Sequence, residues 1–190
     1  MRVTRADAEK NRARLGAAAA KQLREQGIEG VGVDALAKAA DLTHGGVYSH
    51  FKSKDDLTAA AVAHALQTSF REWQALTADL EPEQKFRRMI SIYVSRHHRD
   101  ATGEGCSIAT LGAGAGRGGK KLRSTFAMGV EGLIGMMSAA RGGETRSQAR
   151  ATAIANTAAM VGAVVMARAA GANQELSDEI LKTVRAELLK

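Results

Sequence analysis

Apolar residues recur at helical spacing along almost the whole chain, and no run of alternating β-branched residues lies between turn signals. The pattern predicts an all-α protein of about nine helices. The first helix is expected to begin at Thr4, where Thr4 and Asp7 fit a capping box, and to end at Gly27. Its apolar face is formed by Leu15, Ala19 and Leu23.

Three helices are expected to follow in quick succession. Thr43 can cap a short third helix that runs through Phe51, and Ser53 can cap a long fourth helix. The short second helix carries the i, i+3, i+4, i+7 set of Val33, Leu36, Ala37 and Ala40. Two short helices joined by a brief turn and followed at once by a long helix have helix-turn-helix geometry, here at residues 33–50.

The remaining pattern predicts helices only. Pro82 suits the first turn of a fifth helix that runs to Gly103, and a short apolar piece covers residues 106–111. Further helices are expected around residues 122–137 and about 145–170, and a last one from Ser177.

The third helix presents small and hydrogen-bonding side chains, which suits a helix lying in a DNA groove. Glycines allow close approach of the backbone, groups near the helix start could reach base edges, and the later polar groups could contact phosphate. The candidate DNA-binding residues are Thr43, His44, Gly45, Gly46, Val47, Tyr48, His50 and Lys54. Val47 points either inward or towards a thymine methyl group, and the segment could also be two packed core helices.

This stretch resembles the TetR family of bacterial transcriptional regulators. The matching positions keep their order and spacing over about the first 60 residues, and they are Gly27, Val33, Leu36, Ala37, Ala40, Gly45, Val47, Tyr48, His50, Phe51, Ser53, Lys54 and Leu57. Two positions depart from the family pattern. Gly32 replaces the usual Ser or Thr cap, which should weaken the second helix, and Asp41 replaces the turn glycine but tolerates left-handed backbone.

The resemblance implies a homodimeric repressor. Residues 1–55 would bind a near-palindromic operator in double-stranded DNA, and residues 56–190 would bind a small-molecule or reactive effector and dimerise through the last two helices. The alternative is an activator, or a regulator that binds DNA without an effector. Alanines at every fourth position suit a close helix contact at the dimer interface or within one protomer, and these are Ala155, Ala159, Ala163 and Ala167.

A hydrophobic effector pocket is expected between the middle helices, because methionine-rich surfaces adapt to varied ligands. Its candidate residues, which could also simply fill the core, are Phe86, Met89, Tyr93, His97, Cys106, Leu111, Phe126, Met128 and Met137. The segment Gly105–Ile108 also resembles the start of the sixth helix in a TetR subgroup, some of whose members sense electrophiles or oxidants through a cysteine. Cys106 is therefore either such a sensor or an inert buried thiol.

Composition narrows the remaining classes. A single cysteine allows no intramolecular disulfide and fits a reducing cytoplasm. The most apolar stretch, residues 158–167, falls short of the about 20 residues that span a bilayer, so no membrane partner is expected. The net charge of +7 favours an anionic partner such as nucleic acid. No catalytic set, cofactor site or metal site is evident, since His97 and His98 point about 100° apart between two arginines.

Residues 114–120 read G-x-x-x-x-G-K, close to a phosphate-binding loop. That loop needs a preceding strand and a final Ser or Thr, whereas Lys121 occupies the last position here. A nucleotide-binding enzyme is therefore a remote alternative. The preferred interpretation is a mobile gate over residues 112–119, because each glycine costs about 1 kcal/mol in a helix.

Overall fold

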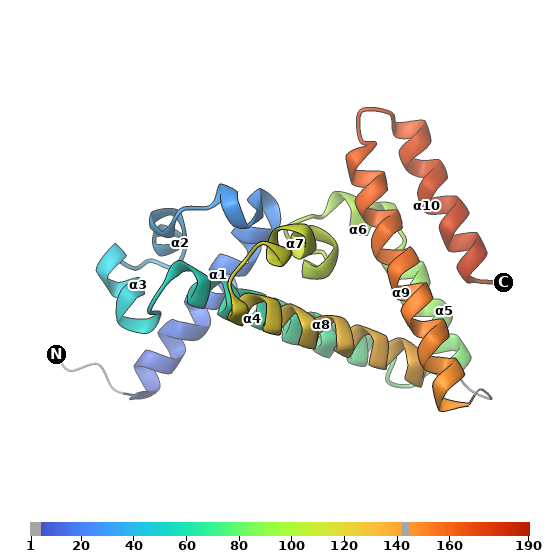
Figure 1. The fold of residues 1–190 in the computed structure, drawn as a ribbon, viewed down its shortest axis with the longest axis horizontal. Coiled ribbons are helices and arrows are strands. Elements are labelled where there is room, and N and C mark those ends of the chain that lie inside the picture. Colours follow the sequence, from blue (N-terminus) through green and yellow to red (C-terminus); the bar gives the residue numbers. More distant parts are fainter. Residues whose placement is uncertain (1–4, 142–144) are drawn as a thin grey trace.

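The structure is a computed structural model that describes residues 5–141 and 145–190, and this part of the chain contains ten α-helices and no strand (Figure 1). The predicted all-α class is confirmed. The capping box predicted at Thr4 lies outside the described residues. The helices are α1 (Arg5–Gly30), α2 (Val33–Ala39), α3 (His44–His50), α4 (Lys54–Leu76), α5 (Pro82–Tyr93), α6 (Arg96–Asp100), α7 (Ser107–Gly116), α8 (Lys120–Ala139), α9 (Arg146–Ala169) and α10 (Gln174–Leu188).

Helices α1, α2 and α3 form a unit at one end of the molecule (Figure 1). Helix α1 is interrupted at Gly27, the predicted end, where φ is 79°, before a further turn to Gly30. Gly32 precedes α2 without a side-chain cap. Asp41 adopts φ 57° between α2 and α3, so it does take left-handed backbone at the turn. The buried side chains of the unit include Leu23, Leu36, Val47 and Phe51.

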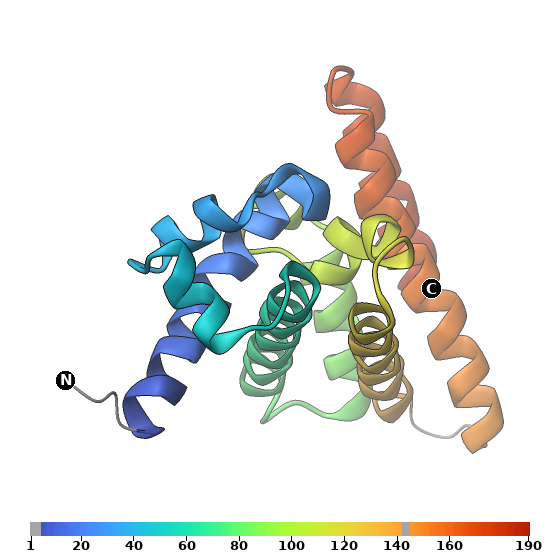
Figure 2. The same cartoon turned by 60° about the vertical axis from the view of Figure 1, so that its left-hand side comes forward.

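Helix α4 joins this unit to the rest of the chain. It packs against α1 on one side and α8 on another, and Figure 2 shows α8 lying between α4 and α9. Two glycines of α8 let it approach α4 closely. A Cβ at Gly129 would lie 2.5 Å from Leu66 Cδ1, and one at Gly132 would lie 2.7 Å from Phe70 Cε2. A larger side chain at either position would require the Leu66 or Phe70 side chain, or the helices themselves, to shift.

The predicted fifth helix is wrong in one respect, because it is two helices. Val94 leaves helical geometry with ψ 70°, and Ser95 caps α6 by accepting a hydrogen bond from the His98 N–H at 3.1 Å. The Ser95 hydroxyl also donates to the Ile92 carbonyl oxygen at 2.7 Å. A single serine thus ends α5 and begins α6, which explains the tenth helix.

Helices α9 and α10 pack together at the end of the molecule away from α3 (Figure 1). The last helix begins earlier than predicted, because Asn173 caps it by accepting from the Leu176 N–H at 3.1 Å. Ser177 instead donates its hydroxyl to the Ala167 carbonyl oxygen. Among the described helices, α9 alone is long and apolar enough to cross a membrane. The core helices of water-soluble proteins can meet the same criteria of length and composition, and 33% of the apolar window of α9 is buried.

The glycine-rich stretch is more ordered than predicted. Residues 112–116 complete α7, and only residues 117–119 form a turn before α8. The predicted mobile gate is therefore wrong for residues 112–116. Packing against α1, where a Cβ at Gly114 would lie 3.3 Å from Ile28 Cδ1, compensates for the low helix propensity of glycine.

A buried histidine fixes the connection between α6 and α7. His98 Nδ1 lies 2.7 Å from the Tyr93 carbonyl oxygen, and the Cys106 N–H donates to His98 Nε2 at 2.9 Å. These contacts require a neutral ring with its proton on Nδ1. Arg168 of α9 donates to the His98 carbonyl oxygen at 2.6 Å. Burial, with smaller effects from the Arg168 and His97 charges, lowers the pKa of His98 from 6.5 to about 4.

Acidification should therefore destabilise the protein through His98. Between pH 6.5 and about 4 the unfolded chain binds a proton at His98 that the folded chain does not, so the stability present above pH 6.5 falls as the pH is lowered. We expect the free energy of unfolding in urea to be lower at pH 5 than at pH 8 by about 2 kcal/mol from this group. The His98→Gln variant should be less stable than the wild type at pH 8, and its free energy of unfolding should lack the part of the pH dependence that is due to His98. The His97→Gln variant, altered at an exposed histidine, should keep that pH dependence. Equal pH dependence in both variants would contradict this role of His98.

Candidate functional site

The first turn of α3 exposes bare backbone at Gly45. Thr43 caps α3 by accepting a hydrogen bond from the Gly46 N–H at 3.1 Å. No heavy atom would lie within 4 Å of a Cβ at Gly45, so this glycine borders open space. At Gly45 the backbone of α3 can therefore lie against another surface without side-chain bulk.

His44 and Tyr48 form one exposed group on α3. His44 Nδ1 pairs with the Asp34 carboxylate of α2, and its ring centroid lies 5.1 Å from that of Tyr48. Tyr48 is 45% exposed although it is a large aromatic residue. When His44 Nδ1 donates to Asp34, Nε2 is left as an acceptor. The two rings thus present an acceptor and a phenol on the same face.

The other candidates of this segment occupy different positions. Val47 is 1% exposed and lies in the core, so the structure favours the inward alternative for this residue. His50, at the end of α3, is partly buried. Lys54 is the first residue of α4, directly after the Ser53 cap, where the helix dipole is positive. The structure therefore brings Thr43, His44, Tyr48 and Lys54 to one end of the molecule and removes Val47 from the surface.

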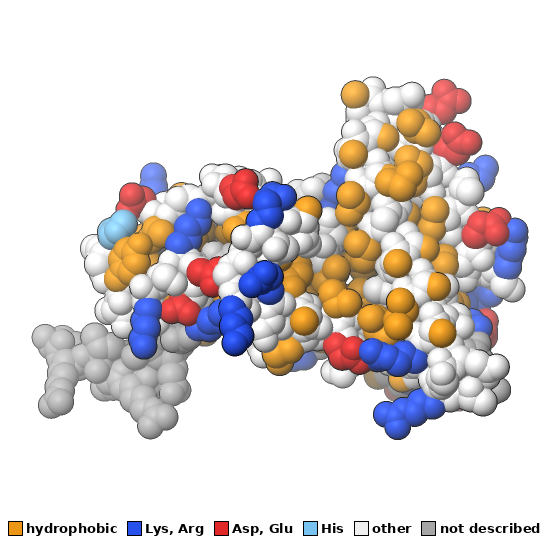
Figure 3. Space-filling view, viewed as in Figure 1, with side chains coloured by type: hydrophobic (Ala, Val, Ile, Leu, Met, Phe, Trp, Pro, Cys, Tyr) orange, Lys and Arg blue, Asp and Glu red, His pale blue; other side chains and the backbone are white. Residues whose placement is uncertain are grey.

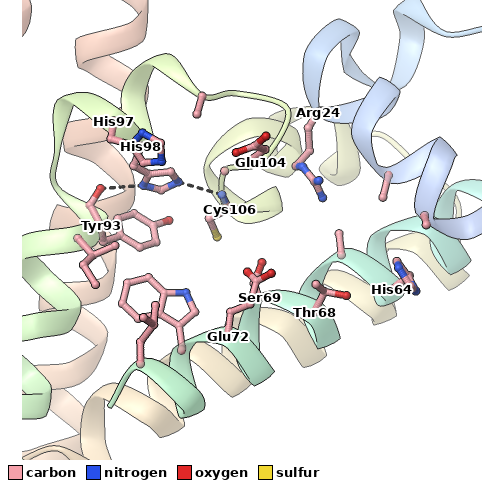
Figure 4. Close-up of a pocket in the computed structure, with 18 residues that line it drawn as sticks. Arg24, His64, Thr68, Ser69, Glu72, Tyr93, His97, His98, Glu104 and Cys106 are labelled. Carbon is pink, nitrogen blue, oxygen red and sulfur yellow. Dashed lines mark hydrogen bonds between the residues drawn. The ribbon is translucent and has the colours of Figure 1, made fainter. Parts of the chain in front are cut away.

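A cavity of about 490 Å³ lies at the junction between α1, α4, α5 and α6 (Figure 4). Helix α1 supplies Arg24, and α4 supplies several side chains that include Glu72 and Trp73. The opposite wall consists of Tyr93, from α5, and Cys106, from the start of α7. The unit formed by α1, α2 and α3 and the rest of the chain thus share the wall of one cavity.

The cavity has an apolar aromatic side and a polar side. The Trp73 and Tyr93 rings lie 6.2 Å apart, and Tyr93 is only 1% exposed. The Tyr93 hydroxyl makes no hydrogen bond of good geometry among the described residues, and burial, with smaller contributions from the neighbouring Cys106 thiol, raises the pKa of Tyr93 well above its usual value. It therefore remains a neutral phenol that can donate to a ligand. Arg24 Nε donates to the Gly103 carbonyl oxygen at 2.7 Å, and burial lowers the pKa of Arg24.

Only part of the predicted pocket lines this cavity. Tyr93, His97 and Cys106 do so, whereas Leu111 lines a second, smaller cavity beside Gly27. Met128 is 74% exposed on α8. The others lie in the hydrophobic core away from the cavity wall, and these are Phe86, Met89, Phe126 and Met137. These four residues therefore fit the alternative interpretation given above, in which the candidate pocket residues simply fill the hydrophobic core.

The residues that sequence reasoning missed lie on one face of α4 and one face of α1. On α4 the polar positions His64, Thr68 and Glu72 recur every four residues beside the apolar stripe. This spacing could have indicated these cavity residues from the sequence, because residues four positions apart lie on the same face of a helix. Among the described residues, no group of three or more His, Cys, Asp or Glu side chains is arranged to hold a metal ion.

Comparisons with known proteins agree with the geometry of the amino-terminal unit. The family model described as bacterial regulatory proteins of the tetR family matches residues 15–61. The HTH-type transcriptional regulator SAB2452 of Staphylococcus aureus (strain bovine RF122 / ET3-1) is 28% identical over 90 residues. This match covers 47% of the chain and 49% of the relative, so it spans about half the length of each.

Solved structures extend the similarity of fold to nearly the whole chain. The reduced form of E. coli NemR has a TM-score of 0.73 and 21% identity, and the match covers 92% of this chain and 95% of NemR. A TetR-family regulator from Agrobacterium tumefaciens has a TM-score of 0.76 and 19% identity, with 95% and 98% of the two chains covered. Residues 15–61 are therefore similar to the helix-turn-helix domain of tetR-family bacterial regulatory proteins, and nearly the whole chain shares the fold of solved TetR-family regulators.

Proposed function

We propose that the protein is a homodimeric repressor that binds a near-palindromic operator and is released by an effector in the junction cavity. Members of this family are non-enzymatic DNA-binding proteins. The observation that carries the proposal is the shared cavity wall, because α1 of the DNA-binding unit contributes Arg24 to it directly. A ligand bound there would contact α1 and α4 directly, so no chain of intermediate residues is needed for it to move these helices. The division at residues 55 and 56 remains part of this proposal, as does a cytoplasmic location beside the chromosome.

The proposed release requires strong coupling between the cavity and α3. An effector that reverses a 99:1 population must prefer the released conformation by about 10⁴-fold, or ~5.5 kcal/mol. Helix α4 supports this coupling, since Trp73 lines the cavity and Lys54 begins the same helix. An activator, or a regulator without an effector, would use the same DNA contacts. The remote nucleotide-binding alternative is not retained, because no strand precedes residue 114 in the described chain and α7 includes its first glycine.

The proposed dimer uses the exposed apolar surface of α9 and α10. Figure 3 shows hydrophobic side chains gathered over these two helices. The predicted alanine stripe is divided, because Ala163 and Ala167 are buried within the protomer and Ala155 is exposed. The exposed face is formed instead by larger residues, which include Ile154, Val165, Met166 and Leu176. A two-fold contact there would cover apolar area that is otherwise open to water.

A reactive effector is a second form of the same proposal. Cys106 precedes α7 as its N-cap, is partly exposed and lines the cavity beside Tyr93 (Figure 4). The solved structure of NemR is described as its reduced form. A thiol that reacts inside the cavity would change the packing between α6 and α7, because the Cys106 N–H is held by His98.

The DNA contacts can be tested at Tyr48 and Lys54. Tyr48→Ala and Lys54→Ala should each weaken operator binding by about tenfold or more, because each removes a hydrogen bond to phosphate. The operator can be selected from random-sequence duplexes with the wild-type protein, and binding measured by fluorescence anisotropy. Arg71→Ala, at an exposed site further along α4, serves as the control. Wild-type affinity in both test variants would refute the assignments.

The dimer can be tested at Met166, which is 58% exposed on α9. Met166→Glu would place a carboxylate in the proposed interface and should weaken dimerisation on the order of a hundredfold, since desolvating an unpaired charge costs several kcal/mol. Sedimentation equilibrium would measure the shift towards monomer. The control is Met128→Glu, at a methionine exposed on α8. A wild-type protein that is already monomeric at micromolar concentration would remove the dimer model.

The reactive-effector form can be tested at Cys106. Brief exposure to a quinone or hypochlorite should add mass at Cys106 and release the wild-type protein from the operator. Cys106→Ser should remain bound under the same treatment, because the chain has no other cysteine. Mass spectrometry and anisotropy on the same samples give both readouts. Equal loss of DNA binding in the two proteins would end the sensor hypothesis.

A further inference from the structure

A run of basic residues lies outside the helix-turn-helix unit, at the start of α8. Residues 117–123 read RGGKKLR, with four basic side chains and no acidic one. More of the net charge lies beyond residue 60 than before it, +5 against +2. Figure 3 shows Lys and Arg side chains gathered around the start of α8 and on the neighbouring helix-turn-helix unit. The TetR-family match at residues 15–61 does not include this run.

The start of α8 is fastened to the start of α4. The Gly119 N–H donates to Asp55 Oδ1 at 3.1 Å, and Lys121 Nζ lies 2.6 Å from Asp56 Oδ1. The hydrogen bond from Lys121 lowers the pKa of Asp56. A Cβ at Gly119 would collide with the Asp55 carboxylate, so the contact depends on glycine.

Helices α4 and α8 run parallel. Near their starts, residues 55 and 56 meet residues 119 and 121, and further along, Leu66 meets Gly129 and Phe70 meets Gly132. The amino-terminal ends of both helices therefore point in the same direction. That end of α4 carries Lys54, the proposed phosphate contact, and the positive ends of the two dipoles lie side by side.

The four basic side chains divide into two pairs. Arg117 is held by Glu29 of α1 at 3.1 Å, and Lys121 is held by Asp56. Lys120 and Arg123 are exposed, and no carboxylate lies within ion-pair distance of either one among the described residues. They are three positions apart, so they project from the same face of α8.

We infer that Lys120 and Arg123 form a second DNA-contacting surface that binds backbone phosphates between the two half-sites of the operator. Helix α8 lies between α4 and α9 (Figure 2), so in a dimer built on α9 and α10 its start faces the DNA segment near the two-fold axis. Duplex DNA carries one negative charge per about 1.7 Å of its axis, so a basic helix start at this place faces a dense row of phosphates. The inference rests on the docking of α3 and the start of α4 proposed above.

The test is the salt dependence of DNA binding by the full chain. In the double variant Lys120→Gln/Arg123→Gln, the slope of log affinity against log salt should fall by about 2 to 4 per dimer, because each phosphate contact contributes ~0.9. Affinity should fall at least about tenfold near 0.15 M salt, equally on the selected operator and on a duplex of unrelated sequence. The matched control is Lys85→Gln/Arg88→Gln on α5, which removes the same charge at the same spacing far from α3.

The outcomes distinguish direct phosphate contact by α8 from a general effect of lower net charge. An unchanged slope in the α8 variant, or an equal fall in the α5 control, overturns the inference. A wild-type slope with Lys120→Arg/Arg123→Lys, and a wild-type melting temperature in every variant, support it. Lys54→Ala is measured alongside. If Lys54→Ala lowers the slope and the α8 variant does not, only this inference fails, and if neither lowers it, the proposed docking of α4 fails as well.

Discussion

The packing of α4 between α1 and α8 is the constraint on which the other contacts depend. On one side Gly16 of α1 approaches His64, and on the other Gly129 and Gly132 of α8 approach Leu66 and Phe70. Among the described residues, the buried hydrophobic side chains on the two sides of α4 therefore form one continuous core. Any change that tilts α4 must repack α1, which holds α2 and α3, so the position of α3 is tied to the packing of α8 against α4.

The helix-turn-helix could be predicted from the sequence because its signals are local. Thr43 and Ser53 cap their helices with their own side chains, and Asp41 adopts the left-handed backbone that its position requires. The cavity depends instead on contacts between residues that are distant in the sequence. Arg168 reaches His98 across 70 positions, and Arg24 reaches Gly103 across 79. The periodicity of apolar residues does not indicate which residues distant in the sequence come into contact.

The membership of the pocket could not be predicted for a related reason. Methionine and aromatic side chains at helical spacing describe a core as well as a ligand site, and Phe86 and Met137 belong to the core. The cavity forms where α1 and α4 present arginine, histidine, threonine and glutamate next to the aromatic rings of Trp73 and Tyr93. Polar groups on an otherwise apolar helix face are the better indication of a cavity, because a closed core would leave them unsatisfied.

The stretch that reads like a phosphate-binding loop also binds an anion through a backbone N–H group, but it does so within the protein. Such a loop uses free backbone N–H groups at a helix start to bind an anion. Here the Gly119 N–H at the start of α8 also binds an anion, but the anion is the carboxylate of Asp55 in the first turn of α4. Glycine is needed because a side chain would collide with that carboxylate. The glycine-rich stretch therefore joins the start of α8 to the start of α4, and the basic residues that follow it lie at the end of α8 beside the end of α4 that carries Lys54.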